Sequence, residues 1–255
     1  MEFLHLLLPP VGGTFAYEID ELLETITLLM GIAFVISLTI IVILIFAFRR
    51  QPGVKAKYLT GETKNELIPI YLTLAAFVFF DMIIDVKTHH VWAKVKESLP
   101  SAQVTVRAVA QQWAWTFVNP GADGELGTAD DIQSVNELHL PAGKLAHVEL
   151  ESSDVLHSFS LPIIRIKQDA IPGRIITIWF ESLPFDEMKA IKDEMNRNAG
   201  DDGALLGADT ANSASFDLQC AEMCGVGHGI MAAKVIFHSD EDYANWQAAN
   251  APVAE

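Results

Sequence analysis

Two long apolar runs dominate the first ninety residues. Thr25–Phe48 carries no charged residue over twenty-four positions and is followed by Arg49 and Arg50. Leu67–Val86 is a second run, interrupted by Pro69 and by two acids near its far end. Because a helix of about twenty residues crosses a bilayer core of roughly 30 Å, the pattern predicts two transmembrane helices that form a hairpin.

The charges around these runs predict their orientation. Five Lys and Arg residues lie between the runs, whereas residues 1–24 contain none. Positive loops stay in the cytoplasm, so we expect both termini to face outward. The opening residues make a poor signal peptide, because their start is acidic and their apolar stretch is short. The predicted division is an outward N-terminal segment (1–24), a transmembrane hairpin (25–90) and an outward domain (91–255).

From about Ser101 the pattern changes from runs to alternation. Short segments with apolar residues at every second position, separated by Gly, Pro and Asp turns, are typical of a β-sandwich or barrel. The segments are Val104/Val106/Ala108, Trp113/Trp115/Phe117, Ala146/Val148/Leu150, Ile175–Ile178 and Val235–Phe237.

Two stretches interrupt the predicted strands. Pro120–Ile132 is rich in Gly and Asp, but its acids do not follow the spacing of an EF-hand, which favours an exposed turn over a calcium site. Asp186–Asn198 has a helical composition and precedes a Gly/Asp-rich stretch. We therefore expect a helical segment inserted in the domain near residues 186–213.

The charge of the chain is strongly negative. The formal net charge is −16, and residues 87–255 hold 12 Lys and Arg against 24 Asp and Glu. Such a surface repels nucleic acid and attracts a basic partner, although acidity for solubility alone gives the same composition. With 2 Cys in 255 residues, the domain is not a disulfide scaffold.

Candidate metal chemistry lies near the end of the chain. Within twelve residues, Cys220–Met231 offers two thiols, the imidazole of His228 and a thioether. Soft sulfur ligands together with imidazole are the ligand set of electron-transfer copper sites. A mononuclear blue-copper site needs a single Cys, so a second thiol four positions away suggests a binuclear centre. The second imidazole is expected from an earlier strand end, and His157 is the candidate.

Simpler interpretations stay open on these residues alone. Two Cys in an outward domain also form disulfides, and a zinc site uses thiols and imidazoles, although Met is a poor zinc ligand. An isolated histidine such as His157 is more often an ordinary residue at a sheet edge.

Four stretches carry a resemblance to a known family. The chain resembles subunit II of cytochrome c oxidase along almost its whole length, in the order hairpin, aromatic stretch, histidine-bearing strand and metal-binding loop. The resemblance implies a two-helix transmembrane hairpin followed by an all-β cupredoxin domain, a Greek-key sandwich. The matching stretches are Gln112–Phe117, Asp154–Phe159, Lys167–Arg174 and Cys220–Met231.

The resemblance also implies a binuclear copper centre of the CuA type. Its two thiolates would bridge two copper ions, each imidazole would bind one ion, the thioether would be a weak ligand, and one backbone carbonyl would complete the set. The side chain of Glu222 would in addition bind a magnesium ion at the contact with the catalytic subunit. The implied copper ligands are His157, Cys220, Glu222 (backbone oxygen), Cys224, His228 and Met231.

Further roles follow from the same resemblance. Trp113 matches the exposed tryptophan that accepts an electron from cytochrome c, while Trp115 and Phe117, on the same predicted strand face, are expected to be packing residues. Glu66, at the start of the second run, matches a glutamate at the entrance of a proton channel. Pro69 and Thr73 depart from the family pattern beside it, so an interfacial acid without such a role stays open.

The implied function is that of the electron-accepting subunit of a respiratory haem-copper oxidase. It would receive electrons from cytochrome c, or from a c-type donor domain, and pass them to the haem of subunit I, where oxygen is reduced and protons are translocated. Expected partners are subunit I, subunit III and membrane lipid. The expected location is a bacterial inner membrane, with the C-terminal domain on the periplasmic side. No Cys-x-x-Cys-His motif occurs, so the donor haem belongs to another protein.

Three other families share part of this pattern. A membrane-anchored copper chaperone of thioredoxin-like fold also uses two Cys and a distant His, but places its Cys pair before the His. A quinol oxidase subunit II shares the scaffold and lacks the copper ligands. A nitrous oxide reductase has a similar copper loop and needs a large propeller domain, for which 255 residues leave no room.

Overall fold

A computed structural model describes residues 8–55, 59–199 and 213–252. The chain divides into two compact units, which we describe separately. The first comprises Glu18–Lys94, and the second comprises the N-terminal segment up to Tyr17 together with Val95 onward. Part of the predicted insertion, residues 200–212, lies outside the described residues.

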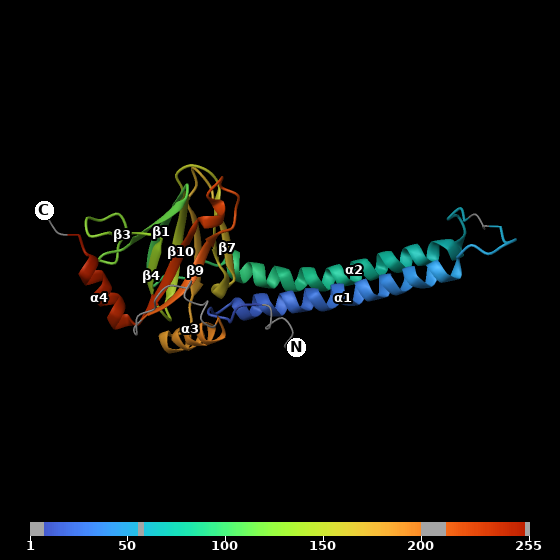
Figure 1. The fold of residues 1–255 in the computed structure, drawn as a ribbon, viewed down its shortest axis with the longest axis horizontal. Coiled ribbons are helices and arrows are strands. Elements are labelled where there is room, and N and C mark those ends of the chain that lie inside the picture. Colours follow the sequence, from blue (N-terminus) through green and yellow to red (C-terminus); the bar gives the residue numbers. More distant parts are fainter. Residues whose placement is uncertain (1–7, 56–58, 200–212, 253–255) are drawn as a thin grey trace. The chain divides into compact units, whose positions relative to one another are not determined.

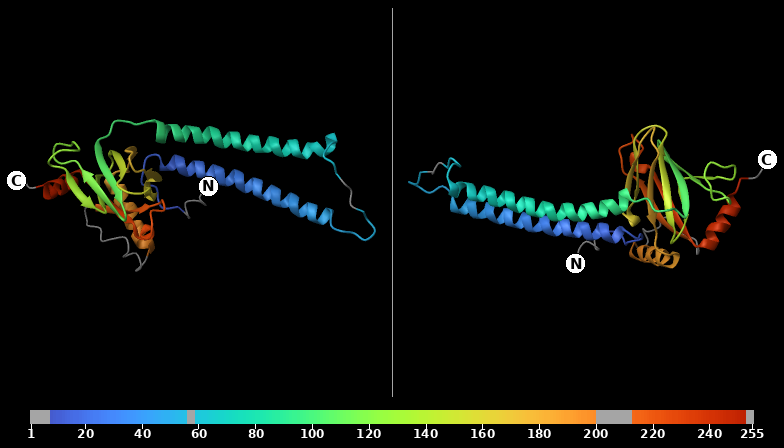
Figure 2. Two further views of the ribbon diagram at one scale, coloured as in Figure 1. Left: turned by 90° about the horizontal axis from the view of Figure 1, so that it is seen from above. Right: turned by 180° about the vertical axis from the view of Figure 1, so that it is seen from behind.

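The first unit is a pair of long helices. Helix α1 covers Ala16–Ala47, and helix α2 covers Lys64–Trp92 and continues into one π-helical turn, η2, at Ala93–Glu97. Both are long and apolar enough to cross a membrane. Lys87 near the end of α2 donates to Glu21 and Thr25 near the start of α1, at 3.1 and 3.0 Å, so the helices are antiparallel. Figure 2 shows them running alongside each other.

Helix α1 begins earlier than the apolar run that predicted it. The run starts at Thr25, but the helix starts at Ala16. The first two turns carry acids such as Glu18 and Glu21, which are compatible with helix and favourable near its N-terminus. A hydropathy pattern predicts the apolar part of a helix. It does not reveal polar turns that precede that part.

In the described residues of the second unit, ten strands form two five-stranded sheets, and Figure 1 shows their arrangement. The first sheet has the order β3-β2-β1-β5-β8, and the second has the order β4-β10-β9-β6-β7. Two of the pairings, β1 with β5 and β4 with β10, are parallel. The strands are β1 (Val104–Gln111), β2 (Ala114–Asn119), β3 (Ile132–Val135), β4 (Glu137–Pro141), β5 (Leu145–Ser152), β6 (His157–Leu161), β7 (Ile166–Ala170), β8 (Ile176–Glu181), β9 (Ser213–Cys220) and β10 (Ala232–His238).

The core lies between the two sheets. Residues alternate between buried and partly exposed along β1, β2 and β5, because successive side chains of a strand point to opposite faces. Trp115 and Phe117 of β2 and Phe159 of β6 are fully buried. The Trp115 ring stacks on Phe117 and meets Phe159 edge-on, with ring centroids 6.3 and 5.9 Å apart. The interior is therefore aromatic beneath the end of the sandwich where β6 begins.

The predicted fold class is confirmed. Two apolar helices precede an all-β sandwich, and the inserted helix α3 is present at Phe185–Ala199. The Gly/Asp-rich stretch between β2 and β3 is a run of turns. An all-β sandwich is not a thioredoxin-like fold, which removes the copper-chaperone alternative.

The N-terminal segment belongs to the sandwich unit. Gly12 donates to the Ile163 carbonyl (2.9 Å) and accepts from Leu183 (2.9 Å), and Phe15 packs edge-on against the Trp179 ring at 5.2 Å. A Cβ atom at Gly12 would lie 2.8 Å from the Ile163 side chain. The close approach of the two backbones explains a glycine at this position.

A buried histidine pair lies under the C-terminal helix α4 (Asp240–Asn250). Nδ1 of His139 in β4 and Nε2 of His238 at the end of β10 are 2.9 Å apart, so one ring donates and the other accepts. The ring of Trp246 stacks on His139 with centroids 4.2 Å apart. Burial lowers the pKa of each imidazole to about 4, and the charge of His139 contributes to the lowering at His238.

The pair predicts acid-sensitive stability. Both folded-state pKa values lie below the ordinary value of 6.5, so the unfolded chain binds more protons between these limits. The contribution is complete above pH 6.5 and is lost as the pH falls toward 4. His139→Gln removes one imidazole, and we expect the acid-induced loss of unfolding free energy to shrink by up to about 3 kcal/mol. Thermal unfolding of the full chain between pH 7 and 4.5 measures this, and identical profiles for parent and variant would contradict it.

Candidate metal centre

The cysteine-bearing loop joins β9 to β10 and is fixed at its base. Cys220 is the last residue of β9, and its N–H donates to the carbonyl of Met231, which directly precedes β10, at 3.0 Å. The next residue, Ala221, donates to Ser158 of β6 at 3.0 Å. Backbone pairing therefore ties the loop to the strand that begins with His157.

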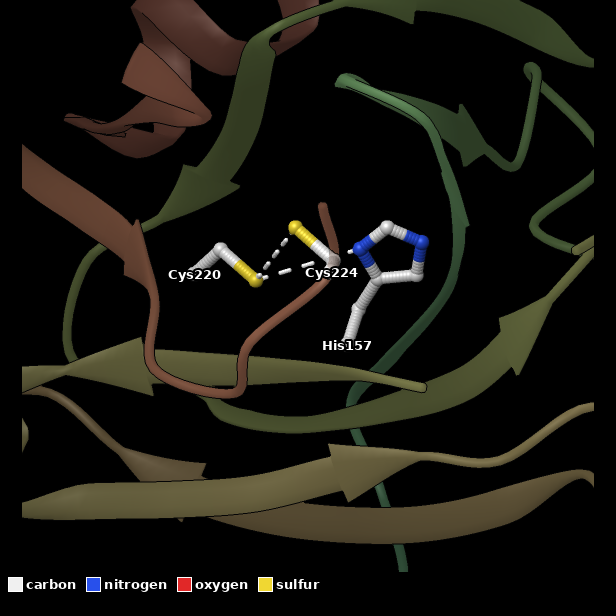
Figure 3. Close-up of side chains that lie close together, drawn as sticks. All are labelled: His157, Cys220 and Cys224. Carbon is white, nitrogen blue, oxygen red and sulfur yellow. Dashed lines mark hydrogen bonds between the residues drawn. The ribbon is translucent and has the colours of Figure 1, made fainter. Parts of the chain in front are cut away.

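Sulfur and imidazole groups converge at this point, and Figure 3 shows three of them, from His157, Cys220 and Cys224. The Sγ atoms of the two free cysteines, Cys220 and Cys224, are 3.8 Å apart. Nδ1 of His157 lies 3.8 Å from Cys220 Sγ, and Nδ1 of His228 lies 3.6 Å from Cys224 Sγ. Each imidazole thus faces a different sulfur.

Two weaker donors complete the cluster. The Sδ atom of Met231 is 3.8 Å from Cys224 Sγ, and the backbone oxygen of Glu222 is 3.3 Å from Cys220 Sγ. All six predicted ligand residues are therefore brought together. The side chains of His157, Cys220, Cys224 and Met231 are buried.

Asp154 sets the orientation of His157. Its Oδ1 lies 2.9 Å from His157 Nε2, so the other ring nitrogen, Nδ1, is left to face the sulfurs. Its Oδ2 accepts from the backbone N–H of Gln112 at 2.8 Å. A carboxylate that holds the far nitrogen of a histidine is the usual arrangement around metal-ligating imidazoles.

The surroundings of Cys224 disfavour its thiolate form. Burial raises the pKa of Cys224 to about 11, and the neighbouring Cys220 adds to the rise. A soft cation that binds this sulfur as a thiolate would therefore release a proton.

Trp113 lies against the loop but not on the strand where the alternating pattern placed it. It sits in the turn between β1 and β2, and its side chain is 40% exposed. Its Nε1–H donates to the carbonyl of Cys224 at 3.1 Å, and the side-chain amide of Gln112 donates to the same oxygen at 2.8 Å. A Cβ atom at Gly227 would lie 2.4 Å from the Trp113 ring, so the indole is in direct contact with the loop that holds Cys224.

Exposed apolar side chains surround the loop. Val226 is fully exposed, and Ile230 and Met223 are 83% and 73% exposed. Leu156, next to His157, is exposed as well. Sequence reasoning did not single these residues out, although apolar residues within a short metal-binding loop, which is a surface element, are a usable signal for a contact surface.

The remaining predicted residues have separate surroundings. The Glu222 side chain is partly exposed. Glu66 accepts hydrogen bonds from the N–H groups of Gly61 (3.0 Å) and Thr63 (3.4 Å), which gives it a capping role at the start of α2. Its role at a proton channel stays a prediction.

Comparison with known proteins shows where the chain has relatives. Residues 104–184 match the sequence model of the family described as cytochrome C oxidase subunit II, periplasmic domain. The alternative cytochrome c oxidase subunit 2 of Bradyrhizobium diazoefficiens is 27% identical over 259 aligned positions, which cover 93% of this chain and 81% of that protein. These matches support subunit II of cytochrome c oxidase as the family that the chain resembles.

Other relatives of this chain match over shorter stretches. Cytochrome c oxidase subunit 2 of Thermostichus vulcanus is 32% identical over 151 residues, and the match spans 59% of this chain but only 35% of that protein. The solved periplasmic domain of subunit II of cytochrome oxidase of Bradyrhizobium japonicum is 26% identical, covers 60% of this chain and 96% of that chain, and has a TM-score of 0.41. The matched family region includes Trp113 and His157 and ends before the loop of Cys220.

The geometry of this site predicts a role for Asp154. Asp154→Ala removes the acceptor that orients His157, and we expect the affinity for a soft metal ion to fall by roughly 10–100-fold. Competition with a chelator measures the affinity. Asp193→Ala, which removes an acid paired with Lys189 on α3, is the control and should leave it unchanged. Equal affinities of Asp154→Ala and the parent would contradict the orienting role.

Proposed function

We propose that this chain is the electron-accepting subunit of a respiratory haem-copper oxidase and that it holds a binuclear copper centre of the CuA type. One observation carries the proposal: two imidazoles from different parts of the chain each face one of two adjacent, unlinked thiols. The proposed copper ligands are His157, Cys220, the Glu222 carbonyl, Cys224, His228 and Met231.

The donor set fits two copper ions better than a single zinc ion. The sulfurs, imidazoles and thioether are ligands that select copper. A structural zinc site takes four ligands around one ion and makes poor use of a thioether, whereas here the six donors divide between Cys220 and Cys224. Paired thiolates with one imidazole on either side support two neighbouring metal positions.

When bound, such a copper pair supplies one-electron redox chemistry. The residues of the chain hold its ligands still. Trp115, fully buried, lies edge-on to His157 with ring centroids 6.3 Å apart, and Asp154 fixes the opposite nitrogen of the same imidazole. Packing and hydrogen bonding together exclude water and keep the ligand from turning, as a site that must accept two oxidation states requires.

The surface around Trp113 supports electron acceptance from cytochrome c, or from a c-type donor domain. Its indole is the exposed aromatic group that contacts the Cys224 carbonyl. The apolar side chains of Val226, Ile230 and Met223 offer contact area around it. The negative charge of the domain attracts a basic donor in a salt-dependent way.

The helices support a membrane anchor. With α1 and α2 spanning a bacterial inner membrane, the positive loop between them lies in the cytoplasm and the sandwich lies on the periplasmic side. Subunit I would receive the electron at its haem, reduce oxygen and translocate protons, and subunit III would complete the membrane contacts.

Copper stoichiometry tests the proposal directly. We expect two copper ions per chain, and an electron spin resonance pattern of one electron shared by two copper nuclei. Metal analysis and spectroscopy of the full chain measure both, and Cys224→Ser should abolish the shared pattern. A single copper per chain, or the hyperfine pattern of one nucleus, would show the binuclear assignment to be wrong.

Trp113→Phe tests electron acceptance. Phenylalanine keeps an aromatic ring against Gly227 but loses the N–H that binds the Cys224 carbonyl. We expect electron uptake from cytochrome c to slow by roughly tenfold, equal to about 1.4 kcal/mol of barrier, with copper content unchanged. Stopped-flow kinetics measure the rate, and Trp246→Phe, on α4, is the matched control. An unchanged rate, or loss of copper, would argue against this role.

We also propose that the carboxylate of Glu222 binds magnesium at the contact with subunit I, since hard oxygen ligands suit this ion. Its carbonyl faces Cys220, so the two functional groups of one residue would serve two metals. Glu222→Gln in the assembled oxidase is expected to lose magnesium and retain copper. Metal analysis that finds magnesium at the parental level would remove this assignment.

A further inference from the structure

The sandwich unit has a cavity that is separate from the cluster of proposed copper ligands. It has a volume of about 210 Å³ and is lined by Val95, Lys96, Ser98 and Leu99, and by residues of β7 and β8. Ile176 and Ile178 contribute apolar walls, and Lys96, Gln168 and Trp179 contribute polar groups. Pockets for whole small molecules usually measure about 300–1,000 Å³, so this cavity has room for one end of an amphiphile.

Two of the polar groups of the cavity, on Lys96 and Trp179, are hydrogen-bond donors only. The ammonium of Lys96 donates to the Gln168 side-chain oxygen at 2.7 Å and has three donor hydrogens in all. The indole N–H of Trp179 is buried and has no hydrogen-bond partner within the described part of the chain. Asp169 is the carboxylate whose charge acts on Lys96. A buried donor without a partner costs about 1–3 kcal/mol, so an acceptor in the cavity would be stabilising.

The chain places this cavity at a membrane surface. Its first wall begins in η2, the turn that continues α2, and the candidate span that includes both ends at Glu97. Residues at the end of a span lie at the depth of lipid headgroups, where Trp and Lys side chains are enriched. A ligand for this cavity needs an anionic acceptor for the donors and an apolar part for the isoleucines. At the membrane surface, a phospholipid has both.

We propose that the cavity binds the phosphate headgroup of an anionic phospholipid, with the phosphate at Lys96 and Trp179 and the upper part of an acyl chain against Ile176 and Ile178. The inference rests on the membrane anchor proposed above. Strand β7 forms one wall, and its residue Ala170 pairs with His157. A bound lipid would therefore contact the strand next to that of a proposed copper ligand.

Brominated lipids test the site, because bromine quenches tryptophan fluorescence at short range. The full chain is reconstituted in nanodiscs of phosphatidylcholine that contain phosphatidylglycerol brominated near the headgroup. The Trp179 signal is the difference between the parent and Trp179→Phe. We expect it to be quenched, and we expect roughly tenfold more brominated lipid to be needed in Lys96→Gln, the scale set by one charged hydrogen bond. Lys144→Gln, which removes a cation paired with Asp240, should match the parent.

Several outcomes would overturn the lipid site. Equal quenching by brominated phosphatidylcholine would show that the anionic headgroup is not recognised. Competition by inorganic phosphate as effective as that by unbrominated phosphatidylglycerol would leave a free-anion site. Loss of the Trp179 quenching in the assembled oxidase would show that a partner subunit fills the cavity. Incorporation into nanodiscs and the copper spectrum test the anchor and the metal centre separately, so failure of the lipid site is distinguishable from failure of the proposed function.

Discussion

The proposed metal centre depends on the pairing of two strands that are distant in sequence. Phe159 of β6 pairs with Cys220 of β9, and Ala221 donates to Ser158. These contacts place the imidazole at the start of β6 beside the thiols at the end of β9. A loop of twelve residues can gather two thiols, one imidazole and one thioether by itself, but it cannot supply the second imidazole. The pairing of β6 with β9 in the sandwich holds His157 at a fixed distance from Cys220.

A second set of contacts connects the ligands to the surface. Asp154 holds His157 with one oxygen and the Gln112 backbone with the other, while Gln112 and Trp113 both donate to the Cys224 carbonyl. The turn that carries Trp113 is thus hydrogen-bonded to the backbone of Cys224 and, through Asp154, to the imidazole that faces Cys220. Because these bonds join one surface aromatic group to both sides of the cluster, the position of the indole and the geometry of the ligands are set together.

Much of this was predictable from the sequence. The hairpin follows from uncharged runs, the sandwich follows from alternation, and the ligands follow from soft donors at close spacing, with His157 supplied by a motif whose partner lies 63 residues away. The position of Trp113 was predicted less well. Trp113, Trp115 and Phe117 share a period of two, yet only the last two lie on β2, because the turn from β1 takes up Trp113. The capping contacts of Glu66 and the bonds of Asp154 depend on backbone geometry, which periodicity does not describe.

The contact between Gly227 and Trp113 has a consequence for how variation in this loop acts. Even one methyl group at position 227 would overlap the indole, so the ring would have to move outward while every sulfur and nitrogen donor kept its chemical identity. The size of residue 227 therefore determines how closely the Trp113 ring can pack against the loop, although residue 227 is not itself a ligand. A survey of ligand residues alone would pass over a position at which a single added carbon displaces the exposed indole of Trp113.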